Sequence, residues 1–159
     1  MKAIYPGTFD PITFGHLNIL EKAAKMFDEV ILAVADYTAK QNYFTLEERL
    51  EQCKEAAKGI PNIKVISFSG LVVDFARQNN CRILIRGLRA VSDFEYELSL
   101  ALTNIKLSED IETVFLVPSL RYMYLSSSMI RQLAELDGEL KDFVPPHVIK
   151  ALKERVRGG

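Results

Sequence analysis

The sequence predicts an α/β protein with one doubly wound sheet of five parallel strands. Five short apolar runs, rich in β-branched residues, alternate with segments in which apolar residues recur at helical spacing. This alternation predicts βαβ units, whose crossover helices cover both faces of a parallel sheet. The chain has 159 residues, nearly half of them hydrophobic, which is enough for one domain with a proper core. We therefore expect residues 1–159 to form a single domain.

The five apolar runs give the expected strands, in chain order: Lys2–Pro6, Glu29–Ala35, Asn62–Phe68, Cys81–Arg86 and Glu112–Val117. Between them, apolar residues three or four positions apart mark the expected helix faces. These faces are Leu17, Leu20, Ala24 and Phe27; Leu46, Leu50, Cys53 and Ala57; Leu71, Phe75 and Ala76; and Phe94, Leu98, Ala101, Leu102 and Ile105.

Helix ends carry their own signals. Thr45 and Glu48 form the pattern of a capping box, which predicts that the second helix starts after Thr45. The Pro145-Pro146 pair is typical of a first helical turn and predicts a last helix, while Gly138 is placed to end the helix before it.

Composition excludes several classes of protein. The formal net charge is −1 with both signs interspersed, whereas binders of nucleic acid or of membrane surfaces normally carry a basic excess. Cys53 and Cys81 lie far apart and form no C-x-x-C pair, and Cys53 sits at helical spacing with apolar residues, so it is expected in the core. The first residues form an expected strand rather than a signal peptide. We expect a cytoplasmic protein that binds a small molecule, not nucleic acid and not a membrane.

Polar or glycine residues follow all five expected strands. In an open parallel sheet the carboxyl ends of the strands border the ligand crevice, so these residues become candidates for one site. They are Thr8, Lys40, Gly70, the stretch from Arg86 to Arg89, and the Ser126-Ser127-Ser128 turn.

The chemistry of these candidates favours a phosphate ligand. Gly7, Thr8 and His16 lie at a strand-to-helix turn, where free backbone N–H groups and the helix dipole attract an anion. Neither GxGxxG nor GxxxxGK[ST] occurs in the sequence, so we expect a hydroxyl, an imidazole and cations to bind the phosphate instead. No HExxH motif, His/Cys cluster or tight carboxylate pair is present, and any Mg²⁺ is expected to be carried by phosphates.

Each candidate also has a plain structural interpretation. His16 alone is more often a helix-capping histidine, Arg86 and Arg89 could pair with nearby carboxylates on the surface, and Lys40 lies in a polar loop where solvated lysines are common. The three serines could be a helix N-cap with redundant hydroxyls. The functional interpretation rests on their shared position at the expected crevice.

The motifs together resemble a known family. Gly7 to Pro11, followed by Thr13-Phe14-Gly15-His16, is similar to the T/HxGH signature of the nucleotidyltransferase superfamily. The stretch from Arg86 to Glu97 (RGLRAVSDFEYE) and the serine turn narrow the resemblance to the bacterial phosphopantetheine adenylyltransferases, over essentially the whole chain. The resemblance implies a Rossmann-like nucleotidyltransferase fold, a homohexamer and a Mg²⁺ requirement.

The resemblance also implies a reaction and a set of site residues. ATP and 4′-phosphopantetheine would give 3′-dephospho-coenzyme A and pyrophosphate, with His16, Lys40 and Arg89 as the catalytic residues. Phosphopantetheine would contact Thr8, Lys40, Val72 and Arg86. ATP would contact Thr8, Phe9, His16, Gly87, Leu88, Arg89, Glu97, Tyr122, Met123, Tyr124, Leu125, Ser126, Ser127 and Ser128.

Two alternatives remain. A sister nucleotidyltransferase with another phosphorylated acceptor, such as nicotinamide mononucleotide, would share the superfamily signature, but the Arg86–Glu97 stretch disfavours it. A non-catalytic ATP-binding α/β module would share the length and the sheet, but we would expect it to carry the glycine-rich phosphate loop that this sequence lacks.

Overall fold

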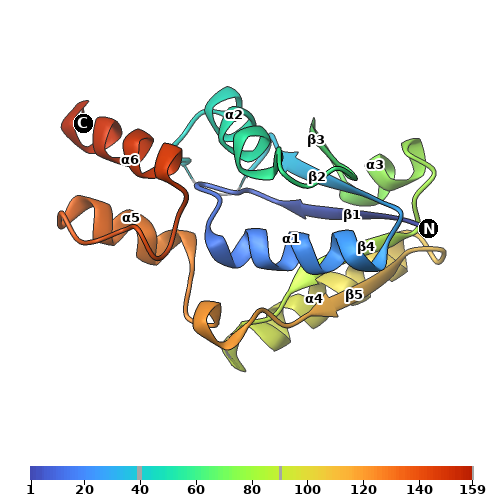
Figure 1. Cartoon of the computed structure of the whole chain (residues 1–159). Coiled ribbons are helices and arrows are strands. Elements are labelled where there is room, and N and C mark those ends of the chain that lie inside the picture. Colours follow the sequence, from blue (N-terminus) through green and yellow to red (C-terminus); the bar gives the residue numbers. More distant parts are fainter. Residues whose placement is uncertain (39–40, 90, 159) are drawn as a thin grey trace.

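The computed structural model describes residues 1–38, 41–89 and 91–158, and within these ranges five strands form one sheet in the order β3-β2-β1-β4-β5 (Figure 1). Every pairing is parallel, which confirms the expected fold class. The strands are β1 (Lys2–Gly7), β2 (Glu29–Ala35), β3 (Ile63–Phe68), β4 (Ile83–Gly87) and β5 (Glu112–Leu116).

β2 has the expected bounds, and the other four strands differ from theirs by one or two residues. Asn62 precedes β3, and its side-chain amide donates to the carbonyl oxygens of Ala24 and Phe27, at 2.8 and 3.1 Å. Cys81 precedes β4, and its thiol lies 3.4 Å from the carbonyl oxygen of Lys2. Both side chains bond to backbone outside the ladder, so they anchor the strand starts.

The helices cover both faces of the sheet. The right-handed crossovers place α1 and α2 on one face and α3 and α4 on the other, while α5 and α6 lie together beyond the carboxyl end of β1 (Figure 1). Among the described residues, no helix is both long and apolar enough to cross a membrane. The helices are α1 (Phe14–Met26), α2 (Leu46–Ala57), α3 (Val72–Gln78), α4 (Val91–Leu107), the 3₁₀ turn η1 (Leu120–Tyr122), α5 (Ser127–Glu135) and α6 (Pro146–Gly158).

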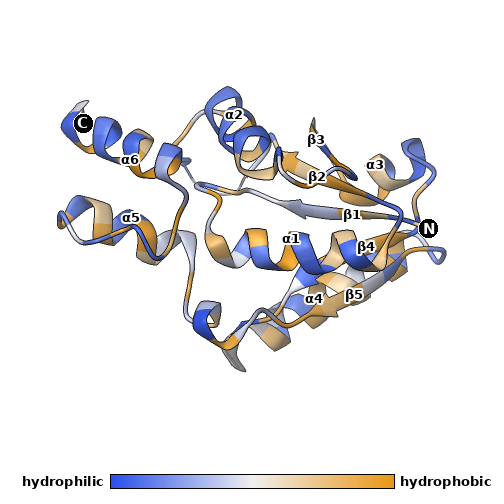
Figure 2. Cartoon of the chain, viewed as in Figure 1, coloured by the Kyte–Doolittle hydropathy of each residue, from blue (hydrophilic) through white to orange (hydrophobic). Residues whose placement is uncertain are grey.

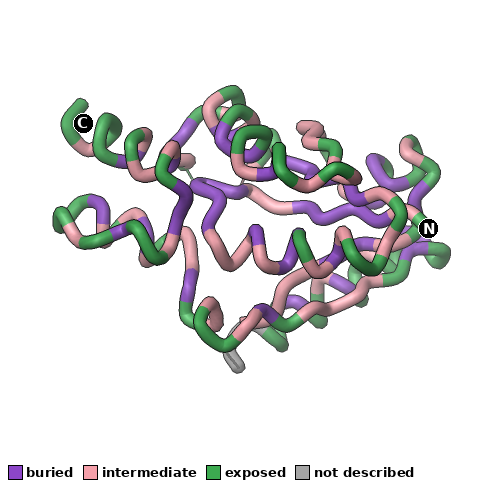
Figure 3. The backbone as a smooth tube through the Cα atoms, viewed as in Figure 1, coloured by how far each residue is buried: buried purple, intermediate pink, exposed green. Residues whose placement is uncertain are grey.

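The core lies on both sides of strands β1 and β2, which are mostly buried in Figure 3. Such strands are apolar along their length because helices cover both faces. One cluster of buried side chains joins the sheet to α1, α2, α5 and α6, and a second joins it to α3. Cys53 is fully buried in the first cluster, as expected, and burial raises the pKa of its thiol to about 12. Cys53 is therefore a core residue, not a nucleophile.

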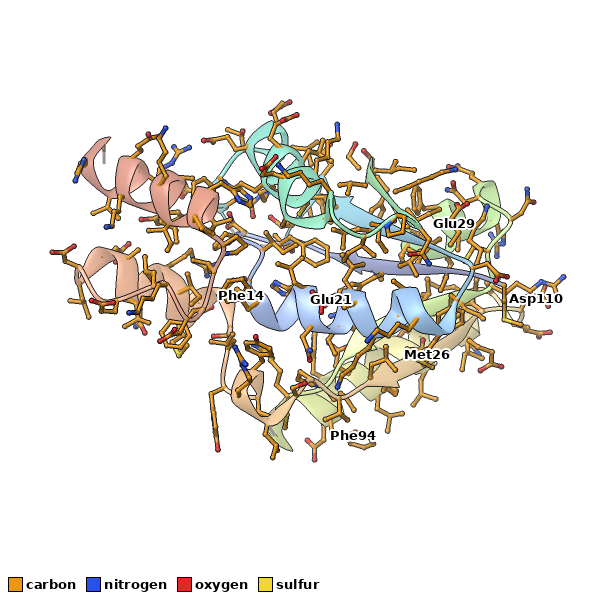
Figure 4. All side chains as sticks on the ribbon, in the orientation of Figure 1. Phe14, Glu21, Met26, Glu29, Phe94 and Asp110 are labelled. Carbon is orange, nitrogen blue, oxygen red and sulfur yellow. The ribbon has the colours of Figure 1, made fainter. Side chains whose placement is uncertain are left out.

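Helix α4 departs from the expectation. The spacing of its apolar residues predicts a face turned to the core, and Ala101 is buried, but the large members of the face are exposed. Orange residues mark α4 in Figure 2, and the labelled Phe94 projects from its outer side in Figure 4. The exposed members are Phe94, Leu98, Leu102 and Ile105. Periodicity identifies an apolar face but not what covers it.

The strand order sets the position of the crevice. β1 and β4 are neighbours at the centre of the sheet, yet the chain leaves β1 for a helix on one face and leaves β4 for a helix on the other. Ligands of open α/β sheets bind at such a switch point, outside the carboxyl ends of the strands.

Candidate active site

A cavity of about 590 Å³ opens at this switch point and collects most of the predicted site residues. They come from the segments after β1, β4 and β5, which are far apart in the sequence and meet at one edge of the sheet. The predicted residues that line the cavity are Thr8, Phe9, His16, Arg86, Gly87, Arg89, Glu97, Tyr122, Leu125, Ser126, Ser127 and Ser128.

Four predicted residues are not among those that line the cavity. Val72 begins α3 and packs against the second core cluster, and Leu88 continues the β4–β5 ladder by donating its N–H to Leu116. Met123 and Tyr124 follow η1, and Tyr124 is 84% exposed. Lys40 lies outside the described residues.

His16 is held by Thr13 in a reciprocal pair of contacts at the start of α1. The Thr13 backbone N–H donates to His16 Nδ1 at 3.0 Å, and Thr13 Oγ1 accepts from the His16 backbone N–H at 3.3 Å. This is a capping box in which histidine takes the place of the usual glutamate or glutamine. Because Nδ1 accepts a hydrogen bond, the neutral ring carries its proton on Nε2.

The surroundings of His16 keep it neutral. Burial, together with the positive charges of Arg89 and Arg86, lowers the pKa of His16 to about 3. The ring of Phe9 packs edge-on against the imidazole, with centroids 5.0 Å apart. His16 is thus a fixed neutral donor at the edge of the cavity.

Phe9 has a strained backbone conformation at this position. Its φ is 53°, in the left-handed region that bulky residues rarely adopt. Gly7 makes room for the ring, because a Cβ at Gly7 would lie 2.9 Å from the Phe9 ζ carbon. Strain of this kind is concentrated at functional sites.

Arg86 and Glu97 form a two-point ion pair. Arg86 Nε and Nη2 donate to the two carboxylate oxygens of Glu97 at 2.8 and 2.7 Å, and Nη1 donates to the carbonyl oxygen of Pro6 at 2.8 Å. The Glu97 side chain is 9% exposed. These three hydrogen bonds hold the planar guanidinium rigidly at the ends of β1 and β4.

The serine turn is a helix cap, as its structural interpretation predicts. Ser126 Oγ accepts from the Met129 N–H at 3.1 Å, and Ser127 Oγ donates to the carbonyl oxygen of Pro11 at 2.8 Å. Arg89 also binds here, by donating to the carbonyl oxygen of Leu125 at 2.7 Å. The first backbone N–H groups of a helix have no partner inside the helix, so the start of α5 can still attract an anion.

Sequence reasoning missed several side chains around the cavity. Tyr96 and Arg131 line it, and Arg131 Nη1 donates to the Asp10 carbonyl oxygen at 2.7 Å. Arg131 follows the serine turn by three residues, and residues three apart on a helix lie on the same face, so this spacing could have placed Arg131 at the site. Within the described part of the chain, no group of three or more His, Cys, Asp or Glu side chains could hold a metal ion.

Comparisons with known proteins agree with this geometry. Residues 4–133 match the cytidylyltransferase-like family model. The chain is 51% identical to the phosphopantetheine adenylyltransferase of Dictyoglomus thermophilum, covering 98% of this chain and 94% of the relative. It is 50% identical to the protein of the same name from Nautilia profundicola, over 95% of this chain and 98% of that relative. The chain therefore belongs to the phosphopantetheine adenylyltransferase family, within the cytidylyltransferase-like proteins.

Proposed function

We propose that this chain transfers the adenylyl group of ATP to 4′-phosphopantetheine, giving 3′-dephospho-coenzyme A and pyrophosphate. The single observation that carries the chemistry is the cavity at the switch point, where neutral His16 lies among groups suited to phosphates. The choice of acceptor is supported by relatives named phosphopantetheine adenylyltransferase, which match this chain over nearly its whole length.

The proposed reaction needs position and charge rather than a general base. An oxygen of the acceptor phosphate attacks the α-phosphorus of ATP, and the bond from that phosphorus to the bridging oxygen of pyrophosphate breaks. The attacking phosphate is already ionised near neutral pH. His16 Nε2–H donates to an α-phosphate oxygen as its charge grows, and the Thr13 contact holds this proton on Nε2.

The two substrates occupy different parts of the cavity in this proposal. Arg86 and Lys40 hold the acceptor phosphate in line, and the Glu97 contacts keep the Arg86 fork in place. Arg86 makes three hydrogen bonds to described residues, and a guanidinium has five N–H groups, so within the described part of the chain two are left to bind a phosphate. Arg89 and the start of α5 hold the leaving pyrophosphate.

Mg²⁺ is proposed to arrive on the phosphates of ATP. Mg²⁺ commonly keeps several waters and binds through substrate phosphates with few protein ligands. The residues around the cavity fit this role, because hydroxyls and arginines predominate among them. Activity should vanish with a chelator and return with Mg²⁺, and equilibrium dialysis should show binding only when nucleotide is present.

We further propose a homohexamer. The resemblance supplies the number of subunits, and the exposed apolar face of α4 supports self-association. Patches of this kind usually mark an interface. Val117, which follows β5, is also exposed. A cytoplasmic location is proposed as well, because both cysteines are free thiols and reducing compartments keep thiols in this form.

The proposal is tested by pyrophosphate release against a panel of phosphorylated acceptors. We expect release with 4′-phosphopantetheine and little with nicotinamide mononucleotide. A preference for another acceptor would indicate a sister nucleotidyltransferase. ATP binding without release for any acceptor would indicate a non-catalytic module.

A further inference from the structure

The carboxylate of Asp10 is buried and fully engaged by backbone. The side chain belongs to the loop that follows β1, and the residue is 6% exposed. Oδ2 accepts from the Tyr43 N–H at 2.7 Å, and Oδ1 accepts from the Phe44 N–H at 2.8 Å. Asp10 therefore ties the loop after β1 to the end of the loop that precedes α2.

Arg49 reinforces the same junction from α2. It is 1% exposed, which makes it one of the largest fully buried side chains. Its Nη1 donates to the carbonyl oxygens of Thr8 and Ala35 at 2.9 and 2.8 Å, and its Nε donates to that of Phe44 at 3.3 Å. Phe44 is thus held at its N–H by a negative side chain and at its carbonyl by a positive one.

Four described residues between these anchors line the cavity. Ala35 is the last residue of β2, and the contacts at Tyr43 and Phe44 fix the other end of the loop. The residues of this segment that line the cavity are Tyr37, Thr38, Gln41 and Asn42. Lys40 lies in the same segment. Movement of Tyr43 and Phe44 would shift the adjoining Gln41 and Asn42, which line the cavity from the loop before α2 and not from α5.

We propose that Asp10 is a positioning residue that fixes Tyr43 and Phe44, and with them Gln41 and Asn42 in the acceptor-side wall of the cavity, with Arg49 as a second anchor. The proposal rests on the proposed function for the identity of the acceptor. Asp10 itself lines the cavity, and each of its carboxylate oxygens accepts a backbone N–H, so we assign its effect on the reaction to the placement of these residues, and the Mg²⁺ dependence of a variant tests this assignment.

Asp10→Asn is the direct test, because the amide keeps the size of the side chain but replaces one acceptor by a donor. We expect KM for 4′-phosphopantetheine to rise about tenfold to a hundredfold, since small misplacements of this kind have such effects. The dissociation constant of ATP and the Mg²⁺ dependence should change less than threefold. Hydrogen exchange should show loss of protection at the Tyr43 or Phe44 amide.

Thr45→Ala is the matched control. It removes the capping box at the start of α2, where Thr45 is exposed, and leaves the Asp10 contacts in place. It should keep both KM values and the protection of the two amides. If Asp10→Asn does not fold, Arg49→Lys provides a second route, because a lysine cannot reach three carbonyl groups at once and should produce the same selective rise in KM.

The outcomes separate the two proposals. If the parent protein releases no pyrophosphate with 4′-phosphopantetheine, the proposed function fails. If the parent is active and Asp10→Asn changes the KM values of both substrates equally, or shifts the Mg²⁺ dependence, the positioning role of Asp10 is wrong. Unchanged protection of the Tyr43 and Phe44 amides in that variant would also overturn it.

Discussion

The backbone N–H of Thr13 donates to Nδ1 of His16, and this contact determines which ring nitrogen carries the proton. The usual capping residue at this position is glutamate or glutamine, and an ionised glutamate would close the helix start without offering a donor to the cavity. Histidine closes the helix start with one nitrogen and leaves the other, protonated, for a ligand. One side chain thereby serves both the fold and the proposed chemistry.

The first prediction concerns the titration of His16. Its pKa is lowered from 6.5 to about 3, so nitrogen NMR should show a neutral ring protonated on Nε2 from pH 7 down to about pH 4. The unfolded chain binds this proton near pH 6.5, so the stability that the neutral ring contributes is present above that pH and is lost as pH falls toward 3. Protonation near pH 6.5 in the folded protein would contradict this account.

Gly7→Ala should disturb the packing of Phe9. The new Cβ would lie 2.9 Å from the ring, so the ring or the strained loop must move. We expect a loss of about 1–3 kcal/mol in the free energy of unfolding, as for other overpacked sites, together with lower turnover. Gly59→Ala is the control, because no heavy atom lies within 4 Å of a Cβ there. Denaturant titration showing equal stability for the two variants would refute the role of Gly7.

Arg86→Ala should affect the acceptor more than ATP. The guanidinium lies at the ends of β1 and β4, and we assign it to the acceptor phosphate. Calorimetric titration should show a much weaker affinity for 4′-phosphopantetheine and a smaller change for ATP, and Lys40→Ala should behave alike. Arg82→Ala, an exposed arginine just before β4, should change neither. Equal losses for both ligands would mean that our division of the cavity is wrong.

The apolar face of α4 predicts how the chain assembles. Leu102 is 58% exposed there, and Leu102→Glu should reduce the mass measured by light scattering, because a charge in an apolar interface is left without a partner. Leu136→Glu is the matched control, since Leu136 is 80% exposed and lies at the end of α5. A monomeric parent at micromolar concentration would overturn the hexamer, and an unchanged mass for Leu102→Glu would exclude this face as the interface.

The sequence predicts the sheet well because its signals are local. Runs of β-branched residues mark the strands, Thr45 and Glu48 form the expected capping box, and the rule for parallel sheets brings distant loops to one edge. The contacts of Asp10 and Arg49 could not be predicted in this way, because they join residues between 5 and 41 positions apart and leave no periodic pattern.

The exposed face of α4 was missed for a different reason. A helix that covers its own sheet and a helix that awaits a partner have the same apolar spacing, and only the packing of the folded chain distinguishes them. The interpretation of His16 as a capping histidine is confirmed, but its partner Thr13 was not foreseen, because a threonine followed three residues later by histidine is not a recognised capping pattern.

His16→Ala should leave the fold intact and lower turnover by roughly 10²–10³, the usual loss when one preorganised donor to a developing charge is removed. Binding of ATP should survive, because the other groups that line the cavity remain. His147→Ala is the control, since that imidazole bonds to the Gln52 carbonyl oxygen and is not among the cavity residues.

The fate of the α-phosphate of ATP tests the central claim most directly. With ATP labelled at the α-phosphorus, 4′-phosphopantetheine and Mg²⁺, the parent protein should move the label into the adenylylated acceptor and release unlabelled pyrophosphate. His16→Ala should do so roughly 10²–10³ times more slowly. Label that stays in ATP, or that appears in ADP or free AMP instead of the acceptor, would contradict adenylyl transfer by this site.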